Sequence, residues 1–198
     1  MPEFSTSKKH QIGLLLLWMT TLGQASITLY LPSFPAIASY FKISPIEVKQ
    51  TIAIFILGFG GSTMFYGPMS DRHGRKPILL FGIFIACIGY VINLIATTTP
   101  IFIFARLLQG VGCGGVLVSG RSIARDLFSG HELAGAMSNL SMGFAIGFGI
   151  SPSIGGLLTS YFGWRANFIF LLLSVTLCQK RWLTKKIILN SANFYITL

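Results

Sequence analysis

The sequence predicts an all-α membrane protein with six transmembrane helices, and its composition is the first reason. Of its 198 residues, 53% are hydrophobic and only 10% are charged, whereas about a quarter of the residues in an ordinary soluble domain are charged. A membrane-spanning helix needs about 20 mostly apolar residues. Six candidate stretches lie between the polar islands, near residues 12–31, 48–69, 77–97, 100–122, 133–160 and 163–178.

The positions of the basic residues are the second reason. When the N-terminus is placed inside, eleven of the 15 Lys and Arg residues fall on the inner side of the predicted spans and three fall on the outer side. This bias follows the positive-inside rule and predicts that both termini are cytoplasmic. A nucleic-acid-binding module would instead gather its basic residues on one solvated face. The net charge of +10 therefore does not indicate a nucleic-acid partner, and the expected surroundings are a lipid bilayer.

A match without gaps between the second and fifth spans is the third reason. At an offset of 89 residues, GFGGSTMFYGPMSDRHG aligns with GFGISPSIGGLLTSYFG, which brings Gly58 onto Gly147 and Gly67 onto Gly156. A repeat of three spans crosses the membrane an odd number of times, so its second copy is inverted. The sequence therefore predicts two inverted three-helix repeats.

The first span ends in LYLPSFPAIA, where Pro32 and Pro35 each lack a backbone donor. Either the helix kinks or breaks there, or it simply ends at the outer surface. Lys8 and Lys9, followed by IGLLLLWMTTLGQA, could also begin a cleaved signal sequence. The apolar run continues to Leu31, so we favour an anchored span.

A charged loop, GPMSDRHGRKPIL, follows the second span. The Asp71 carboxylate can accept from Arg75 one helical turn later, or from the N-terminal amides of a neighbouring helix. Gly67 and Gly74 permit a close approach and a tight turn. The alternative is that the charged loop only sets the orientation of the chain in the membrane. The positive-inside rule would then require Arg and Lys but no Asp.

Arg106 lies inside the fourth span, where a cation costs about 2.5–3.5 kcal/mol on insertion scales. It stands six residues after Pro100, which places it about 9 Å along the helix at 1.5 Å per residue. At that depth it can face a cavity or bind a carbonyl rather than reach the interface. The alternative is structural pairing with the backbone or with Gln109.

The fifth span carries Pro152, Gly155 and Gly156, which would bend the helix and bring it against a facing one. A local kink without a transport role is the alternative. A central cavity could be lined by polar or flexible side chains of several spans. These candidates are Gln24, Thr28, Tyr30, Gln109, Asn139 and Met142.

The sixth span fades after FIFLLLSVTLC. Residues 162–178 fall short of the length of about 20 residues that a span needs. The expected organisation is thus a cytoplasmic N-terminus over residues 1–11, a six-helix bundle over residues 12–178 and a basic tail over residues 179–198.

Three of these segments resemble motifs of the major facilitator superfamily. The charged loop is similar to the inner loop motif G-x-L-a-D-r-x-G-r-k-x-x-l, with Met69 in place of Leu. RLLQGVGCG is similar to the fourth-span motif R-x-x-q-G-x-g, and GFGISPSIGG to the fifth-span antiporter motif g-x-x-x-G-P-x-x-G-G, with Ser151 in place of Gly. The matching residues are Gly67, Asp71, Arg72, Gly74, Arg75 and Lys76; Arg106, Gln109, Gly110 and Gly112; and Gly147, Pro152, Gly155 and Gly156.

The segments LYLPSFP and SGRSIARDLF further resemble the bicyclomycin and chloramphenicol efflux branch, the Bcr/CflA drug antiporters. This resemblance implies the N-terminal half of a twelve-span transporter in a bacterial inner membrane. Such a transporter exports small amphipathic molecules in exchange for protons and needs no cofactor beyond the proton gradient. In the family, the inner loop latches the two halves together, and the residue matched by Arg106 serves proton coupling.

The sequence departs from that branch in two places. Thr28 stands where related antiporters commonly carry an acidic residue, and no acidic residue of the chain lies in a predicted membrane interior. The five acids are Glu3, Glu47, Asp71, Asp126 and Glu132. The basic tail is unlike the family's central loop, which we interpret as an aberrant end of a truncated or frameshifted chain.

Three hypotheses follow for the activity. The chain is half of a drug antiporter that is inactive without the missing C-terminal half; or it is a six-span protein that acts as a homodimer; or it is a remnant that associates with partners without transport. We do not expect an enzyme, because no nucleophile, base and orienting group converge. No Cys or His spacing indicates a metal site.

Overall fold

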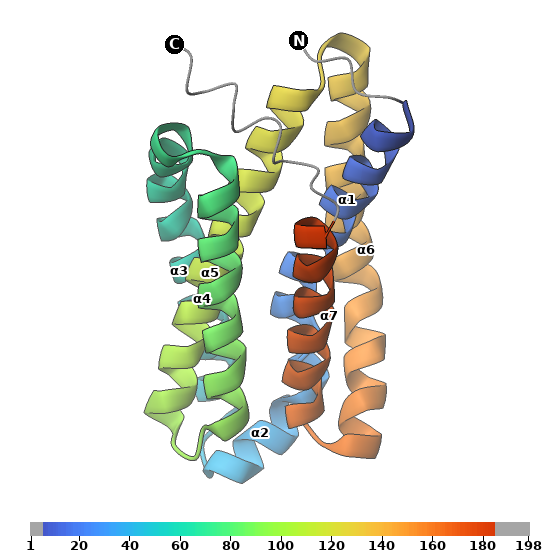
Figure 1. Cartoon of the computed structure of the whole chain (residues 1–198). Helices are drawn as coiled ribbons and strands as arrows, with labels where there is room; N and C mark the ends of the chain where they lie inside the picture. Colours follow the sequence, from blue (N-terminus) through green and yellow to red (C-terminus); the bar gives the residue numbers. More distant parts are fainter. Residues whose placement is uncertain (1–5, 185–198) are drawn as a thin grey trace.

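The computed structural model describes residues 6–184, and these residues form helices joined by short connections (Figure 1). The elements are α1 (Thr6–Thr28), η1 (Leu31–Ser33), α2 (Phe34–Phe41), α3 (Pro45–His73), α4 (Arg75–Ile95), α5 (Thr99–Leu127), α6 (Gly130–Phe162) and α7 (Arg165–Thr184). The predicted all-α membrane fold is confirmed. The observed helices are mostly longer than the predicted spans, because polar residues at their ends continue the helical turns.

Among the described residues, five helical segments are long and apolar enough to cross a membrane. They are Gln11–Phe41, Pro45–His73, Arg75–Ile95, Thr99–Leu127 and Gly130–Phe162. The sixth predicted span forms α7, a helix of 20 residues, and packs against α1, α4 and α6. Its last turns contain Gln179, Lys180 and Arg181, so its apolar part is short. Most of the predicted tail, residues 185–198, lies outside the described residues.

The chain changes direction where the two prolines of the first span stand. Helix α1 ends at Thr28, and Pro32 and Pro35 then occupy the first turns of η1 and α2. A proline is tolerated there because the first amides of a helix have no intrahelical partner. The break that the prolines predicted is therefore present, and α2 crosses the end of the bundle (Figure 1).

The helices form two groups, with α3, α4 and α5 in one and α1, α6 and α7 in the other (Figure 1). Each group mixes the two predicted repeats, because α5 belongs to the second repeat and α1 to the first. Helix α5 packs mainly on α3 and α4, and α1 packs mainly on α6. The repeats are therefore interlocked through an exchange of their first helices.

Glycines make this exchange possible because they let two backbones approach closely. A Cβ built on Gly58 of α3 would lie 2.6 Å from the Leu107 carbonyl oxygen of α5, and one on Gly147 of α6 would lie 2.6 Å from the Thr21 carbonyl oxygen of α1. The offset of 89 residues relates Gly58 to Gly147 and also carries Thr21 to position 110, about one helical turn after Leu107. The two repeats thus use matching contacts.

The closest approach in α6 provides a test of this packing. A Cβ on Gly155 would overlap the Leu29 carbonyl oxygen, whereas one on Gly156 would meet only the Pro32 ring at 3.7 Å. We expect Gly155→Ala to lower the free energy of unfolding by about 1–3 kcal/mol through overpacking. Gly156→Ala, the matched control, should leave it unchanged or raise it by up to about 1 kcal/mol. Thermal unfolding in detergent measures both, and equal melting temperatures would contradict the described contact.

Candidate functional site

The loop between α3 and α4 holds a network of three charged side chains. The Arg75 guanidinium forms an ion pair with Asp71, one turn before it, and donates from Nε to Asp126 Oδ2 at 2.8 Å. It also donates from Nη1 to the Ser70 hydroxyl at 3.3 Å. Asp126 belongs to the last turn of α5, so Arg75 ties the connection between α3 and α4 to a third helix. Sequence reasoning missed Asp126, although it lies in the segment SGRSIARDLF.

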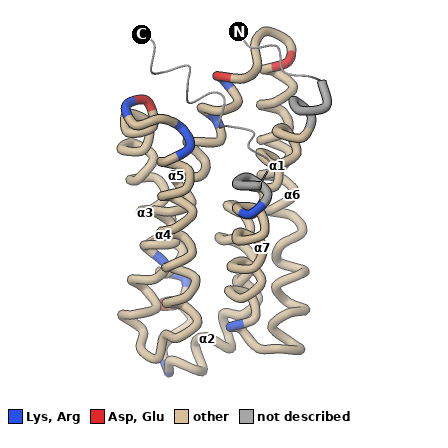
Figure 2. The backbone as a smooth tube through the Cα atoms, in the orientation of Figure 1, with Lys and Arg blue, Asp and Glu red and all other residues tan. Residues whose placement is uncertain are grey.

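The other residues of the loop motif have different surroundings. Gly74 has φ +90°, which explains why a glycine joins α3 to α4. Gly67 has open space where a Cβ would lie, so the described chain provides no close approach there. The side chains of Arg72 and Lys76 make no ion pair with described residues. Charged residues gather at this end of the bundle, as Figure 2 shows.

Arg106 lies at the centre of the bundle and is fully buried. Its Nη1 donates to the Ser26 carbonyl oxygen of α1 at 3.0 Å and to Gln109 Oε1 at 2.6 Å. Its guanidinium carbon lies 4.0 Å from the centre of the Tyr30 ring and 4.6 Å from that of Phe55. The side chain therefore contacts a backbone carbonyl, an amide and two aromatic faces.

No Asp or Glu of the described chain pairs with Arg106. Its Nε and Nη2 have no hydrogen-bond partner among the described protein atoms. The positive charge is therefore held by dipoles and aromatic rings alone, although a buried cation without a counter-ion is costly. Aromatic faces attract a desolvated cation by about 2 kcal/mol, which offsets part of this cost.

Gln109 is the shared acceptor of a polar cluster that the sequence did not reveal. Asn93 of α4 donates to the same Gln109 oxygen at 3.2 Å. Near it, the hydroxyls of Ser26 and Tyr90 lie 2.5 Å apart. All of these side chains are buried. The available signal was the presence of Asn93 and Tyr90 in an otherwise apolar span.

Glycines explain why this cluster is dense. A Cβ on Gly110 would overlap the Phe55 carbonyl oxygen, and one on Gly112 would overlap the Ala86 amide. These two residues of the fourth-span motif therefore bring α3 and α4 against α5. In the described structure these two glycines serve helix packing. The face of α5 that they bury also carries Arg106.

The residues of the antiporter motif lie where α6 contacts α1. The Thr28 hydroxyl donates to the Gly147 carbonyl oxygen at 3.3 Å, and the Ser151 hydroxyl bonds the same oxygen. Helix α6 continues without interruption through Pro152. Gly155 makes the close contact with Leu29 described above. The motif thus joins α6 to the end of α1 within this chain.

The predicted cavity residues do not come together in one place. Thr28 and Tyr30 are buried in helix contacts, and the Tyr30 hydroxyl lies 3.1 Å from the Thr51 hydroxyl of α3. Gln24 is half-buried, whereas Asn139 and Met142 are exposed on α6. The structure therefore separates a buried pair from three side chains nearer the surface of α1 and α6.

Comparison with known proteins identifies the family. Residues 16–185 match the family model described as Major Facilitator Superfamily. This match covers most of the chain. The chain belongs to the major facilitator superfamily. The prediction from the three motifs is confirmed.

Bacterial resistance proteins are among the relatives of this major facilitator chain. It is 34% identical over 173 residues to Multidrug resistance protein D of Escherichia coli (strain K12), covering 86% of the chain and 44% of that protein. It is 33% identical over 151 residues to the Bicyclomycin resistance protein homolog of Haemophilus influenzae, covering 76% of the chain and 38% of that protein. A Chloramphenicol resistance protein of Pseudomonas aeruginosa is 29% identical over 155 residues, covering 76% of the chain and 36% of that protein.

The solved structures show the same fold. The crystal structure of the human organic anion transporter MFSD10 (TETRAN) superposes with a TM-score of 0.69 at 18% identity, covering 86% of the chain and 46% of that structure. The chain spans less than half the length of these proteins. Its helices correspond to the N-terminal half of a major facilitator fold, as predicted, and it is a multi-pass membrane protein.

The Arg106 cluster provides the second prediction. Gln109→Leu removes one of the two hydrogen-bond acceptors of the buried guanidinium, so we expect the free energy of unfolding to fall by about 1.5–3 kcal/mol. Gln24→Leu makes the same chemical change at a half-buried position, where the amide has no hydrogen-bond partner in the described chain. It should change stability little. Thermal unfolding in detergent compares the two variants, and similar losses would contradict the role given to Gln109.

The charged loop provides the third prediction. The side chain of Asp126 is 30% exposed and that of Asp71 is 65% exposed. Solvent screens the more exposed pair more strongly. Double-mutant cycles with Arg75→Gln should therefore give a larger coupling energy for Asp126→Asn than for Asp71→Asn, with both at or below about 1 kcal/mol. The reverse order would show that Arg75 depends mainly on the Asp71 pair.

Proposed function

We propose that the chain is one half of a proton-coupled drug efflux antiporter of a bacterial inner membrane. The observation that carries this proposal is the buried Arg106 in a chain whose similar relatives include proteins named for multidrug, bicyclomycin and chloramphenicol resistance. A cation inside a span marks a functional position in membrane proteins. The substrates proposed are small amphipathic molecules, moved between two six-helix units that rock against each other.

The proton-carrying carboxylate is proposed to lie in the second unit. A carboxylate couples proton and substrate movement when its exposure, and hence its pKa, changes during the cycle. The acids of the described residues, Glu47, Asp71, Asp126 and Glu132, all lie near helix ends. In this proposal Arg106 is the fixed positive charge whose field such a carboxylate senses across the packed side chains of the bundle. Its guanidinium is fully buried, and its Nε and Nη2 are unpaired within the described chain.

The charged loop is proposed to act as the latch between the two units, at their cytoplasmic ends. Asp71 is the exposed member of the network, with a side chain 65% accessible. Its remaining acceptor capacity suits the N-terminal amides of a helix in the second unit. The basic residues at this end support the proposed orientation, with both termini in the cytoplasm.

The second unit can come from another polypeptide segment or from a second copy of the chain. Exposed apolar side chains on α3 and α6, among them Met64, Phe148 and Leu157, support a docking of either kind. Alternating access requires two units. We therefore propose that a single copy of the described bundle does not transport by itself.

Accumulation of radiolabelled chloramphenicol in bacteria with few efflux pumps tests this function. The chain is expressed alone, with the uncovered remainder of Multidrug resistance protein D, and fused to that remainder. We expect lower accumulation only when the second unit is present, and loss of this effect on collapsing the proton gradient or with Arg106→Ala. Asp71→Asn should reduce export, because it removes the latch charge. Lys42→Gln, a change at the opposite end of the bundle, serves as the control and should leave export intact.

Robust export by the chain alone would contradict the half-transporter proposal. In that case, cross-linking and mass measurement in detergent would decide between a homodimer and a single active unit. Export that survives loss of the proton gradient would contradict the antiport mechanism.

A further inference from the structure

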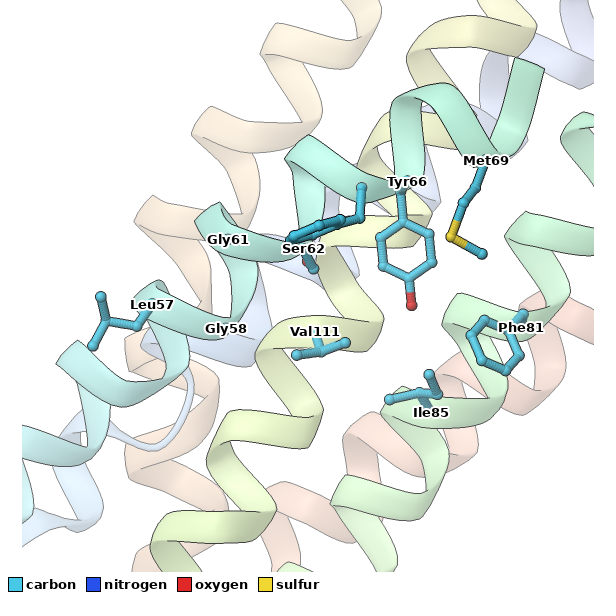
Figure 3. A pocket seen from close by; sticks show the side chains of 10 residues that line it. Leu57, Gly58, Gly61, Ser62, Tyr66, Met69, Phe81, Ile85 and Val111 are labelled. Atoms are coloured by element: carbon cyan, nitrogen blue, oxygen red, sulfur yellow. The ribbon is translucent and has the colours of Figure 1, made fainter. Parts of the chain in front are cut away.

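A groove runs along the outside of the bundle between α3 and α4, with α5 as its floor. It has a volume of about 400 Å³. Figure 3 shows its lining, in which Tyr66, Met69, Phe81 and Ile85 lie close together and Leu57 lies farther along α3. The groove wall is almost wholly apolar, and its Ser62 hydroxyl already donates to the Phe59 carbonyl oxygen.

The α3 side of the groove is one continuous helical stripe. Leu57, Gly61, Phe65 and Met69 follow one another at intervals of four residues, which keeps them on one face of the helix. From Leu57 to Met69 the stripe is about 18 Å long at 1.5 Å per residue. One leaflet contributes about half of the 30 Å hydrocarbon core. The groove therefore has the length of one acyl chain in a bilayer leaflet.

The stripe ends in a cation. Arg72 follows Met69 by three residues and continues the same face, and Lys76 begins α4 across the connection. Neither side chain makes an ion pair with described residues. Asp71, the nearby acid, is already paired with Arg75. An apolar channel of leaflet length thus ends beside Arg72, with Lys76 at the same end of the bundle, and neither side chain has a counter-ion within the described chain.

We propose that the groove binds an anionic phospholipid, with one acyl chain along α3 and α4 and the phosphate on Arg72 and Lys76. Besides Ser62, the Tyr66 hydroxyl is the polar side-chain group of this lining, so the channel offers few polar contacts to an amphipathic drug. A helix from a second protein unit would place apolar residues, rather than an anion, beside the two cations. The combination of leaflet length and terminal positive charge therefore favours a lipid.

Two neighbouring glycines allow the groove to be filled without disturbing the bundle. Gly61 lines the groove and Gly60 does not, yet a Cβ at either position meets no atom within 4 Å. Gly61→Leu should project into the channel and displace an acyl chain. Gly60→Leu makes the same change on the adjacent face and serves as the matched control.

Native mass spectrometry of the detergent-purified chain, titrated with dioleoylphosphatidylglycerol or dioleoylphosphatidylcholine, tests the proposal. We expect one phosphatidylglycerol to be retained more tightly than phosphatidylcholine. Gly61→Leu should abolish this preference and Gly60→Leu should keep it. Arg72→Gln and Lys76→Gln should each weaken the retained phosphatidylglycerol about fivefold, which is the effect of one basic residue at a membrane surface. Arg121→Gln, an exposed basic residue at the end of α5, should leave it unchanged.

Several results would overturn the proposal. If the chain retained the two lipids equally, the proposed contact with a charged headgroup would be wrong. If the Gly61→Leu and Gly60→Leu variants bound phosphatidylglycerol equally, the lipid would not lie in the groove. Dimers that disappear on Gly61→Leu would show that a second copy of the chain occupies the groove. Thermal melting followed by circular dichroism shows whether each variant is folded. The two charge substitutions at the surface keep the test decisive even if the leucine variants unfold.

Discussion

The close backbone approach of α5 to α3 and α4 is the constraint on which the rest of the structure depends. Gly110 and Gly112 leave no room for a side chain at these contacts. Without a hydrophobic force between helices in lipid, such packing is what holds spans together. It also fixes which face of α5 is buried. Arg106 lies on that face, so the same glycines that join the helices carry a cation into the centre of the bundle.

The contacts of Arg75 and those of Arg106 contribute different amounts to stability because the two side chains differ in their exposure to solvent. Arg75 and its carboxylate partners lie at an exposed end of the bundle, where an ion pair contributes at most about 1 kcal/mol. Arg106 is fully buried, where loss of one partner costs several times as much. In the proposed transporter, weak, exposed pairs suit contacts that break and form again in each cycle. A buried charge held by dipoles and aromatic rings suits a group that stays in place.

The fold was largely predictable from the sequence, and so were the local contacts of Arg75 with Asp71 and of Arg106 with Gln109, whereas the contacts between distant helices were not. Hydropathy and glycine content identified the spans, and two prolines located the break after α1. Gln109 of α5 is a partner of Arg106 within the same helix, but the other partners come from α1, from the turn after it and from α3. Ser26 contributes only a backbone oxygen, which no side-chain pattern records. Asp126 is 51 residues from Arg75. Only the packing of α5 beside the connection between α3 and α4 shows that the two residues meet.

The two repeats match in their backbone contacts but differ in one buried side chain. Inverting three helices places the corresponding glycines Gly58 and Gly147 on opposite sides of the bundle, where each receives the backbone of the other repeat's first helix. The symmetry ends at the side chains, because Arg106 on α5 maps at the offset of 89 residues to Leu17 on α1. Arg106 is the one buried charged side chain among the residues whose burial the structure describes. The matched positions thus hold a guanidinium in one repeat and an alkyl chain in the other, so the charge distribution does not share the symmetry of the backbone.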